Sequence, residues 1–546
     1  MSRNTQILLL LALFALLASI PYLVPGTGFL ILIAFIPLLA AEDIAFRTGM
    51  KRFWLWYFAA FAVWNAATTF WVCNATVGGG IFAVVANALR MTAVFALFRW
   101  SRKHLRGILP YLFLAALWVA FERFDLTWAK ISWPWLLLGN AFARTTDWIQ
   151  WYEFTGTLGG SLWTWSVNLG LFALLPLLTK EGREKVPARI RWSCIALALV
   201  LLSVPPVVSL CVMPAPGETA ASDADSVNVL IAQPNINPYD KFGGMTQDLQ
   251  VVELMSLFNK APADSAYLLI GPETFVSGMY LNDLGMHPFY STMSMFLSRR
   301  PQANLLVGAT THRFYESKRR PTVTAREVPQ TGWYDTYNSA LRWNAFSNTE
   351  VYHKSKLVVG VESMPYPKIL RPVDDLLGGV MGRCLGQKEV SVMHYQEFDS
   401  TGVVTREVPF GCAICYESVY GEYCAEYIRK GARFLTVITN DSWWGNTPGY
   451  RQHLSYASLR AIETRRWIAR CANTGISAII DPSGRIVSQT PWWESTLLRG
   501  KIGLSDTQTF FVRHGDWIGR ICLFMAVLLL LTAFVRSILD RKSSRK

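Results

Sequence analysis

The stretch Gly411-Cys-Ala-Ile-Cys-Tyr-Glu417 places a cysteine between a short apolar run and a segment with helical spacing. Ala413 and Ile414 are typical of a strand, and residues 418–430 follow with helical periodicity, so Cys415 falls on a strand-to-helix turn. A free thiol has a pKa near ~8.5 and is a weak nucleophile at neutral pH until a base or a cation favours its thiolate. This stretch therefore predicts an α/β domain that displays a cysteine nucleophile at the end of a strand.

Two other stretches place a reactive side chain just after a predicted strand. In Leu268-Leu-Ile-Gly-Pro-Glu273 an apolar run ends in a carboxylate, and Tyr352-His-Lys354 precedes Leu357-Val-Val-Gly-Val-Glu362. A carboxylate can take the proton of a thiol, and a fixed ammonium can stabilise both a thiolate and a tetrahedral oxyanion. Each residue alone is a weak signal, but Glu, Lys and Cys together are a suitable set for nucleophilic acyl transfer.

These stretches lie within residues 214–515, which have the mixed composition of a globular domain. Short apolar or alternating runs predict strands, and segments with helical spacing lie between them. The predicted strands are 227–232, 267–270, 304–308, 338–342, 413–414 and 434–438, and the predicted helices are 246–260, 289–299, 418–430 and 450–471. This order of elements predicts an α/β soluble domain.

The rest of the chain is far more apolar. Hydrophobic residues make up 52% of the 546 residues and charged residues only 16%, which is unusual for a soluble protein. A transmembrane helix needs about 20 largely apolar residues. The candidate spans are 6–24, 28–46, 53–72, 80–98, 107–122, 161–179, 192–213 and 518–536. We therefore expect a membrane domain of seven helices over 1–213, a soluble domain over 214–515, and a C-terminal membrane helix with a basic tail over 516–546.

Basic residues gather at alternate ends of these spans. They lie at Arg3 and in segments 47–52, 99–106, 180–191 and 536–546, whereas turns 25–28 and 73–80 carry no charge. This is the positive-inside pattern, and it predicts cytoplasmic termini and an extracytoplasmic soluble domain. The net charge of +14 is therefore explained by topology and does not indicate a nucleic-acid partner. No cleavage site follows the first span, so we expect it to remain as an uncleaved helix.

Two polar residues, Asn87 and Arg90, lie inside the fourth span. A charge at that depth is costly unless it is paired or faces water. Arg90 is therefore either a contact for a phospholipid headgroup or a polar cavity, or a residue that snorkels or pairs with another helix. The sequence does not decide between these two interpretations.

Together the motifs resemble the carbon–nitrogen hydrolase (nitrilase) superfamily, and the whole chain resembles its bacterial apolipoprotein N-acyltransferase family. The most specific matches are Ile414-Cys-Tyr-Glu417 and Asn440-Asp-Ser-Trp-Trp-Gly445, and the latter continues through 452–454, 460–463 and 472–475 to Asp481-Pro-Ser-Gly484. The spacing from Lys354 to Glu362 also matches. The resemblance implies a nitrilase-like αββα sandwich joined to a multi-span α-helical membrane domain.

Carried over to matching positions, the resemblance implies a role for each site residue. Glu273 is expected to be the general base, Lys354 the stabiliser of oxyanion and thiolate, and Cys415 the nucleophile. Glu362 is expected to hold Lys354, and Tyr416 and Glu417 to shape the pocket, with the Tyr416 N–H completing the oxyanion hole. No metal or cofactor is expected.

The resemblance also implies a reaction and a location. It is a two-step transfer in which Cys415 takes an acyl chain from a membrane phospholipid as a thioester and passes it to the α-amino group of a diacylglyceryl-modified lipoprotein. The expected location is the bacterial inner membrane, with the catalytic domain in the periplasm. The rival functions are a membrane-anchored amidase or nitrilase with water as acceptor, and a non-enzymatic envelope scaffold or transporter.

The chain departs from the family pattern at three places. Gly271 stands where a Trp usually precedes Pro-Glu, and Val359-Gly-Val stands in place of Pro-Phe-Gly before Glu362. Phe242 replaces a Trp on an arm near the active site. None of these changes removes a reacting group, but they concern how the acyl chain and the lid are held.

Other residues compete for parts of these roles. Lys356 could face the same side of a strand as Lys354, although the Tyr-x-Lys match favours Lys354. Cys412 and Cys415 form a Cys-x-x-Cys pair that could be a redox or metal motif, but without a second pair Cys412 is expected to be a core residue. His453 is expected to pack or to hydrogen-bond at a helix start.

Overall fold

The computed structural model describes residues 1–546 apart from 216–224, 263–265, 368–369, 371, 373–381 and 544–546. The chain divides into two compact units. The helical unit comprises 1–213, 447–455 and 514–546, and the sandwich unit comprises 214–446 and 456–513.

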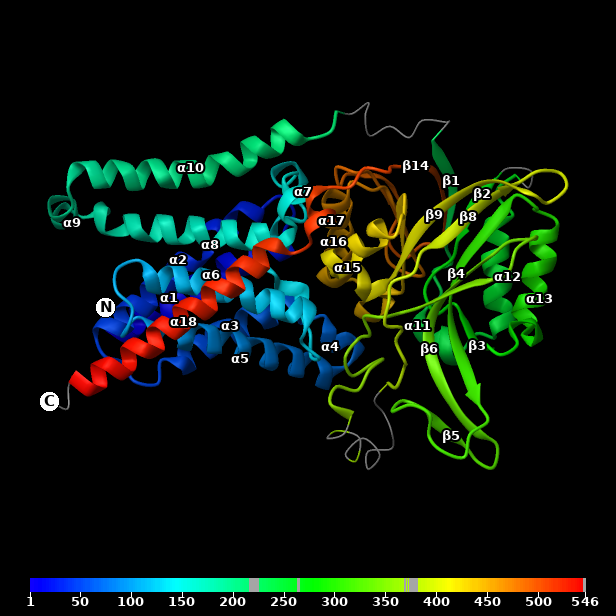
Figure 1. The fold of residues 1–546 in the computed structure, drawn as a ribbon, viewed down its shortest axis with the longest axis horizontal. Coiled ribbons are helices and arrows are strands. Elements are labelled where there is room, and N and C mark those ends of the chain that lie inside the picture. Colours follow the sequence, from blue (N-terminus) through cyan, green and yellow to red (C-terminus); the bar gives the residue numbers. More distant parts are fainter. Residues whose placement is uncertain (216–224, 263–265, 368–369, 371, 373–381, 544–546) are drawn as a thin grey trace. The chain divides into compact units, whose positions relative to one another are not determined.

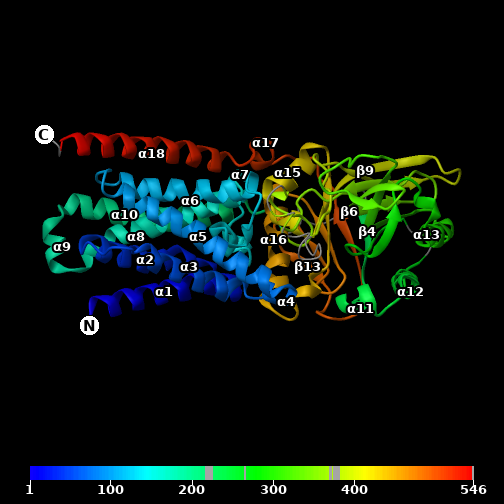
Figure 2. The same cartoon turned by 90° about the horizontal axis from the view of Figure 1, so that it is seen from below.

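Long helices that run side by side form the helical unit (Figures 1 and 2). They are α1 (Arg3–Leu23), α2 (Ile31–Arg47), α3 (Trp54–Thr69), α5 (Val77–Ser101), α6 (Leu109–Thr127), α8 (Thr157–Leu174), α10 (Ala188–Val212) and α18 (Trp517–Ser543). The shorter helices α4 (Val72–Ala75), α7 (Tyr152–Thr155) and α9 (Lys180–Lys185) connect them. Each predicted span therefore coincides with a helix.

Among the described residues, six helices are long and apolar enough to cross a membrane. They are Arg3–Leu23, Gly28–Arg47, Val77–Ser101, Thr157–Leu178, Ala188–Val212 and Trp517–Ser543. The other two helices in the predicted ranges differ from these: α3 has only 16 residues, and α6 carries Glu122, Arg123 and Asp125 near its end. The chain is thus a multi-span membrane protein, and the count of eight spans stays a prediction.

Aromatic rings fill the centre of the helical unit. Phe35 of α2 lies 4.6 Å from the ring of Trp165 and 5.4 Å from that of Trp118. Asn168 of α8 accepts from Phe35 N at 2.8 Å and donates to Ile31 O at 2.9 Å, so its amide joins two backbone groups of α2. Close packing and side-chain hydrogen bonds of this kind hold helices together in lipid, where hydrophobic burial gives little driving force.

Arg90 of α5 is paired with a neighbouring helix. Its guanidinium forms an ion pair with Asp125 of α6 and donates to Asn87 Oδ1 at 3.0 Å and Ile131 O at 3.1 Å. Of the two interpretations of Arg90, the structure therefore shows the interhelical pair. A paired arginine is far less costly within a membrane than a lone one.

Two stacked sheets form the sandwich unit. The first has the order β14-β1-β2-β4-β6-β5, with β3 beside β4 and β7 beside β6. Its strands are β1 (Ser226–Gln233), β2 (Tyr267–Ile270), β3 (Val276–Tyr280), β4 (Ala303–Tyr315), β5 (Arg326–Val328), β6 (Gly332–Trp343), β7 (Glu350–His353) and β14 (Thr496–Gly503). The second has the order β13-β12-β11-β10-β9-β8. Its strands are β8 (Met393–Phe398), β9 (Val404–Ile414), β10 (Phe434–Thr439), β11 (Ile468–Ala472), β12 (Ala478–Ile480) and β13 (Ile486–Gln489).

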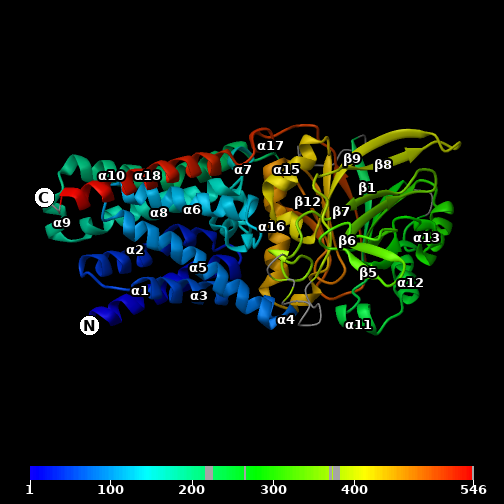
Figure 3. The same cartoon turned by 60° about the horizontal axis from the view of Figure 1, so that its bottom comes forward.

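Helices cover the outer faces of both sheets (Figures 1 and 3). On the first sheet, α12 (Gln247–Phe258) and α13 (Pro288–Ser298) bury Leu254 and Met293 against Leu269 and its neighbours. The second sheet carries α15 (Gly421–Arg429) and α16 (Pro448–Thr464). Between the sheets, the Cys471 thiol of β11 donates to Ala232 O of β1 at 3.2 Å. The predicted αββα sandwich is confirmed.

One predicted helix is wrong in its last part. The predicted segment 450–471 leaves the helix after Thr464, and Ile468–Ala472 is strand β11, parallel to β10. Arg465, directly after the helix, has φ of 49°, a left-handed conformation that stops helix propagation. The apolar run after it fits a helix or a buried strand equally well by periodicity, and pairing with β10 decides between them.

Candidate active site

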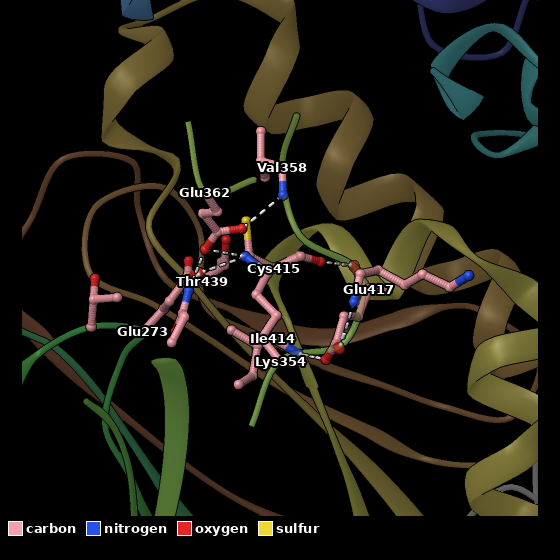
Figure 4. A network of polar contacts seen from close by, with 12 residues as sticks. Glu273, Lys354, Val358, Glu362, Ile414, Cys415, Glu417 and Thr439 are labelled. Atoms are coloured by element: carbon pink, nitrogen blue, oxygen red, sulfur yellow. Dashed lines mark hydrogen bonds and ion pairs between the residues drawn. The ribbon is translucent and has the colours of Figure 1, made fainter. Parts of the chain in front are cut away.

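Glu273 follows β2, Cys415 follows β9, and Thr439 ends β10. These strands pair in parallel with their neighbours, β2 with β1 and β4, and β9 with β10. Loops at the carboxyl ends of parallel strands are the common place for ligand sites in α/β folds. Figure 4 shows side chains from both sheets directed toward one another at this edge of the sandwich.

Cys415 stands on a strained turn. Its φ is 51°, which is rare for a residue with a side chain, and residues Cys415–Val419 continue as a short 3-10 turn. Such a conformation costs about 1–3 kcal/mol and persists only where surrounding contacts hold it. The turn ends β9 abruptly and leaves the thiol at the strand end, as the sequence predicts.

Glu273 also lies on a strained turn that packs closely on β4. Thr274, the next residue, has φ of 46°, and Thr is a β-branched residue for which this conformation is an outlier. Gly308 of β4 holds the turn, because its N–H donates to Pro272 O at 3.0 Å and its carbonyl accepts from Phe275 N at 2.8 Å. A Cβ on Gly308 would stand 2.5 Å from Glu273 Cα, so only glycine fits there.

Lys354 joins two carboxylates. Its ammonium is 3.0 Å from Glu273 Oε1 and 3.0 Å from Glu362 Oε1, and the side chain is 1% exposed. Lys354 follows β7, and its backbone N–H donates to Asn338 O of β6 at 2.8 Å. Burial lowers the pKa of this amine, but the two carboxylates more than offset burial, so its pKa lies well above the ordinary value. The group is therefore a permanent cation at neutral pH.

Asn338 is a second link between the same carboxylates. Its amide nitrogen donates to Glu273 Oε1 at 2.8 Å and to Glu362 Oε1 at 2.6 Å. Glu362 is held in turn by Val358 N, which donates to its other oxygen at 2.8 Å. The two carboxylates thus share both an ammonium and an amide as hydrogen-bond donors.

The thiol of Cys415 is coupled to this cluster. Burial raises its pKa well above the ordinary value and the negative charge of Glu273 adds to this, whereas Lys354 and a hydrogen bond with Thr439 act in the opposite direction. The resting state is therefore a neutral thiol beside a carboxylate, which needs proton transfer before it can attack. In Figure 4 the sulfur lies beside the Glu362, Glu273 and Lys354 side chains.

Glu417 fastens the cysteine turn to the lysine loop. One carboxylate oxygen accepts from Ile414 N at 2.8 Å, and the other accepts from Ser355 N at 2.6 Å and from the Tyr352 hydroxyl at 2.7 Å. The side chain is fully buried. Glu417 therefore fixes the position of Lys354 relative to Cys415 through backbone contacts on both sides.

The competing residues lie elsewhere. The Lys356 ammonium stands over the rings of Tyr420, at 5.0 Å, and Tyr423, at 5.9 Å. Cys412 is buried in β9, and burial raises the pKa of its thiol to about 12, as for a core residue. The ring of His453 packs on Trp135 within the helical unit at 5.7 Å. Within the described residues, no group of three or more His, Cys, Asp or Glu side chains could hold a metal ion.

The three departures from the family pattern have different outcomes. A Cβ on Gly271 would meet Val307 Cγ2 at 3.0 Å, so a larger residue would need this neighbour to shift. Gly360, within the Val-Gly-Val stretch, has φ of 83°, which suits the turn that returns Glu362 to Val358. The side chain of Phe242 lies outside the described residues. Tyr416 is buried and its ring stands edge-on to Tyr420.

Sequence reasoning missed some residues of the site. Asn338 falls within a predicted strand, and strand alternation indicates only a face, not a function. Thr439 directly follows another predicted strand, and Lys241, whose ammonium is 3.1 Å from Glu273 O, adjoins the predicted arm residue Phe242. No local signal identifies these contacts, because each joins segments far apart in the chain.

Comparison with known proteins identifies the family of this chain. The family model for carbon–nitrogen hydrolase matches residues 231–510, just over half of the chain. The chain therefore belongs to the carbon–nitrogen hydrolase family. The family model for the apolipoprotein N-acyltransferase N-terminal domain matches residues 11–170, which lie in the helical unit.

Relatives along most of the chain refine this placement. An apolipoprotein N-acyltransferase of Chlorobaculum tepidum is 29% identical over 92% of this chain and 91% of its own length. That of Geobacter metallireducens is 27% identical over 97% and 95%, and that of Pseudomonas syringae is 28% identical over 89% of each. Within the larger family, the chain is thus a member of the apolipoprotein N-acyltransferases.

Proposed function

We propose that this protein transfers an acyl chain from a membrane phospholipid, through a thioester on Cys415, to the α-amino group of a diacylglyceryl-modified lipoprotein. The observation that carries the proposal is the convergence of Glu273, Lys354 and Cys415 in one cluster, with Lys354 bonded to the acid at 3.0 Å (Figure 4). These are the groups that acyl transfer through a thiol requires.

In the first half-reaction, Glu273 takes the proton of the thiol and the thiolate attacks the sn-1 ester carbonyl of the phospholipid. The Lys354 ammonium stabilises the oxyanion of the tetrahedral intermediate. When the intermediate collapses, the C–O bond breaks and the leaving alkoxide takes the proton from Glu273. A lysophospholipid departs and the acyl group stays on sulfur.

In the second half-reaction, the neutral α-amino group attacks the thioester carbonyl. Glu273 takes a proton from the attacking nitrogen, the C–S bond breaks, and the proton passes to the departing thiolate. The amide forms and the enzyme returns to its starting state. The same base thus serves both steps, and the buried ammonium serves both oxyanions.

The helical unit supports this choice of substrates. Both the donor and the acceptor carry acyl chains in the bilayer, and six helices in the described part of the chain are long and apolar enough to cross it. A hydrolase acting on a small soluble amide would have no need of these helices. By the positive-inside pattern, we propose that the termini are cytoplasmic and that the sandwich unit lies in the periplasm.

Trapping of the acyl-enzyme tests the proposal. The full chain in detergent or nanodiscs is incubated with phosphatidylethanolamine alone and Cys415 is analysed by intact and peptide mass spectrometry. We expect a gain of one acyl chain on wild type and on the matched thiol variant Cys412→Ala, and none on Cys415→Ser. The adduct should be discharged by a diacylglyceryl lipopeptide amine and should persist in water.

The alternatives give different results. Discharge of the adduct by water at the rate seen with the lipopeptide would indicate a membrane-anchored amidase or nitrilase. Unchanged activity after Cys415→Ala would contradict any thioester mechanism and would favour a scaffold or transporter.

A further inference from the structure

A second lysine contacts the backbone of the catalytic acid. Lys241 lies in the short helix α11 (Pro238–Gly243), and its side chain is buried. Its ammonium donates to Glu273 O at 3.1 Å and to Thr274 Oγ1 at 3.3 Å. Both acceptors belong to the strained turn that carries the acid.

The position of Lys241 is itself fixed. Its backbone N–H donates to Asn237 O at 2.8 Å, and its carbonyl accepts from the Gln250 amide at 2.9 Å. Gln250 belongs to α12 and is also buried. Lys241 therefore connects α11 and α12 to the turn after β2 through a rigid chain of contacts.

Lys241 donates hydrogen bonds to two groups of the turn at the strained residue Thr274. The φ of 46° belongs to Thr274, whose preceding carbonyl and own hydroxyl are the two acceptors. Gly308 supports the turn from the β4 side. A left-handed β-branched residue relaxes toward ordinary backbone angles unless such contacts prevent it, and relaxation here would turn the Glu273 carboxylate away from Lys354.

Burial of this amine is unfavourable, so its retention needs a reason. Burial lowers the pKa of Lys241 to about 7, although the nearby Glu273 carboxylate acts in the opposite direction. The two acceptors on the turn, the Glu273 carbonyl and the Thr274 hydroxyl, are uncharged. Burying an amine against them is costly, and what these contacts supply is a fixed geometry of the turn.

We propose that Lys241 is a positioning residue of the acyl-transfer reaction, which holds the strained Glu273–Thr274 turn so that the Glu273 carboxylate stays bonded to Lys354 and directed at Cys415. The inference rests on the proposed function only for its kinetic readout. It identifies the segment next to the arm residue Phe242 as a support of the catalytic acid.

A double-mutant test distinguishes this role from a general structural one. Lys241→Met removes the donors and keeps the length of the side chain. We expect the rate of thioester formation at saturating phospholipid to fall about ten- to a hundredfold, as loss of support for a strained residue implies, with the apparent KM changed less than about threefold. Thr274→Gly should then restore most of the rate in the Lys241→Met background, because glycine adopts the left-handed conformation without strain.

Controls keep the outcome interpretable. Lys260→Met, at an exposed lysine near the end of α12, should leave the rate unchanged. If Lys241→Met does not fold, Thr274→Val removes one acceptor alone and should lower the rate about three- to tenfold. Iodoacetamide labelling of Cys415 and the thermal midpoint report folding without any acyl donor, so failure of the proposed function is seen separately as absence of the wild-type adduct.

Two results would overturn the proposal. One is a Lys241→Met variant with the wild-type rate. The other is a folded Lys241→Met variant whose lost rate is not restored by Thr274→Gly, which would assign the lysine a role other than holding the strained turn.

Discussion

Replacing Lys354 with methionine removes the ammonium that lies 3.0 Å from both Glu273 and Glu362. The new side chain fills most of the same space, so packing is largely kept. The buried Glu273 carboxylate and the Glu362 carboxylate, which is 13% exposed, then share the amide of Asn338. The substitution therefore isolates the contribution of one charge.

The magnitude follows from these distances. Each ion pair at 3.0 Å is worth about 5–6 kcal/mol of attraction at an effective dielectric constant of about 20, much of it offset by desolvation of the ammonium. Removal of one partner from a buried pair costs about 3–5 kcal/mol, and we expect the variant to lose that much free energy of unfolding near pH 8. The catalytic loss should exceed about a thousandfold, because an oxyanion donor alone contributes about 10²–10³ in rate.

The loss of stability should depend on pH in a defined direction. In wild type the folded-state pKa of Lys354 lies above its unfolded value, so its contribution is present throughout the neutral range and is lost only as the pH rises through the folded value. Methionine does not titrate, so the stability deficit of the variant should stay nearly constant from pH 5 to 9. It should shrink only in stronger alkali, where wild type itself loses the ammonium charge.

The assay compares variants of Lys354 and Lys356, the two lysines that the sequence offers for the role of the cation. Thermal unfolding of the full chain from pH 5 to 9 and formation of the Cys415 adduct are measured for Lys354→Met and Lys356→Met. The Lys356 ammonium makes cation–π contacts with Tyr420 and Tyr423, each worth about 0.5–1 kcal/mol, so its variant should keep the acylation rate within about fivefold. If Lys356→Met is the inactive variant, or if Lys354→Met acylates normally, the assignment of the cation is wrong.

Three further predictions concern the same site. Gly308→Ala should abolish detectable acylation, because a Cβ would stand 2.5 Å from Glu273 Cα, whereas Gly285→Ala, where the nearest atom is at 3.4 Å, should retain activity and melting temperature. Glu417→Gln replaces a carboxylate oxygen, which accepts from the Ile414 N–H, with an amide NH₂, which cannot accept. The variant should lose about 2–4 kcal/mol of stability, with a comparable loss of acylation, measured by unfolding and mass spectrometry. The rate of Cys415 alkylation by iodoacetamide should be low at pH 7 and should still rise above pH 9, because the pKa of the thiol is raised. Glu273→Gln should shift this pH–rate profile to lower pH while it prevents acylation. An unshifted profile would show that the acid is not next to the thiol.

Local sequence patterns predict the parts of this fold that depend on short segments. Each membrane-length apolar run became a helix, because an isolated apolar segment in lipid has no other way to satisfy its backbone groups. The runs before Glu273 and Cys415 became strands that end where Gly-Pro and the Cys-Tyr-Glu turn predict. Pattern and structure agree there because residues within one element determine the outcome.

The predictions of secondary structure are wrong where strand pairing between distant segments decides the conformation. The segment Ile468–Ala472 has the spacing of a helix continued from α16, yet it forms a strand because β10 and β12 offer partners on both sides. The short strands β5, β12 and β13 carry too few residues for a periodic signal. Runs of three or four residues gain their structure from neighbours that the local sequence does not contain.

The residues of the site divide in the same way, into those that local patterns predict and those that only contacts between distant segments reveal. Glu273, Lys354 and Cys415 could be selected because each is a reactive group after a strand and matches a motif. Asn338 and Lys241 are ordinary polar residues whose importance lies in what they touch: one amide bonded to two carboxylates, and one amine bonded to a strained turn. A catalytic acid must be both ionised and held in place, and the groups that hold it can come from any segment that the fold brings within 3 Å or so. A motif therefore identifies the atoms that react, whereas their supports become visible only once the sheets are stacked.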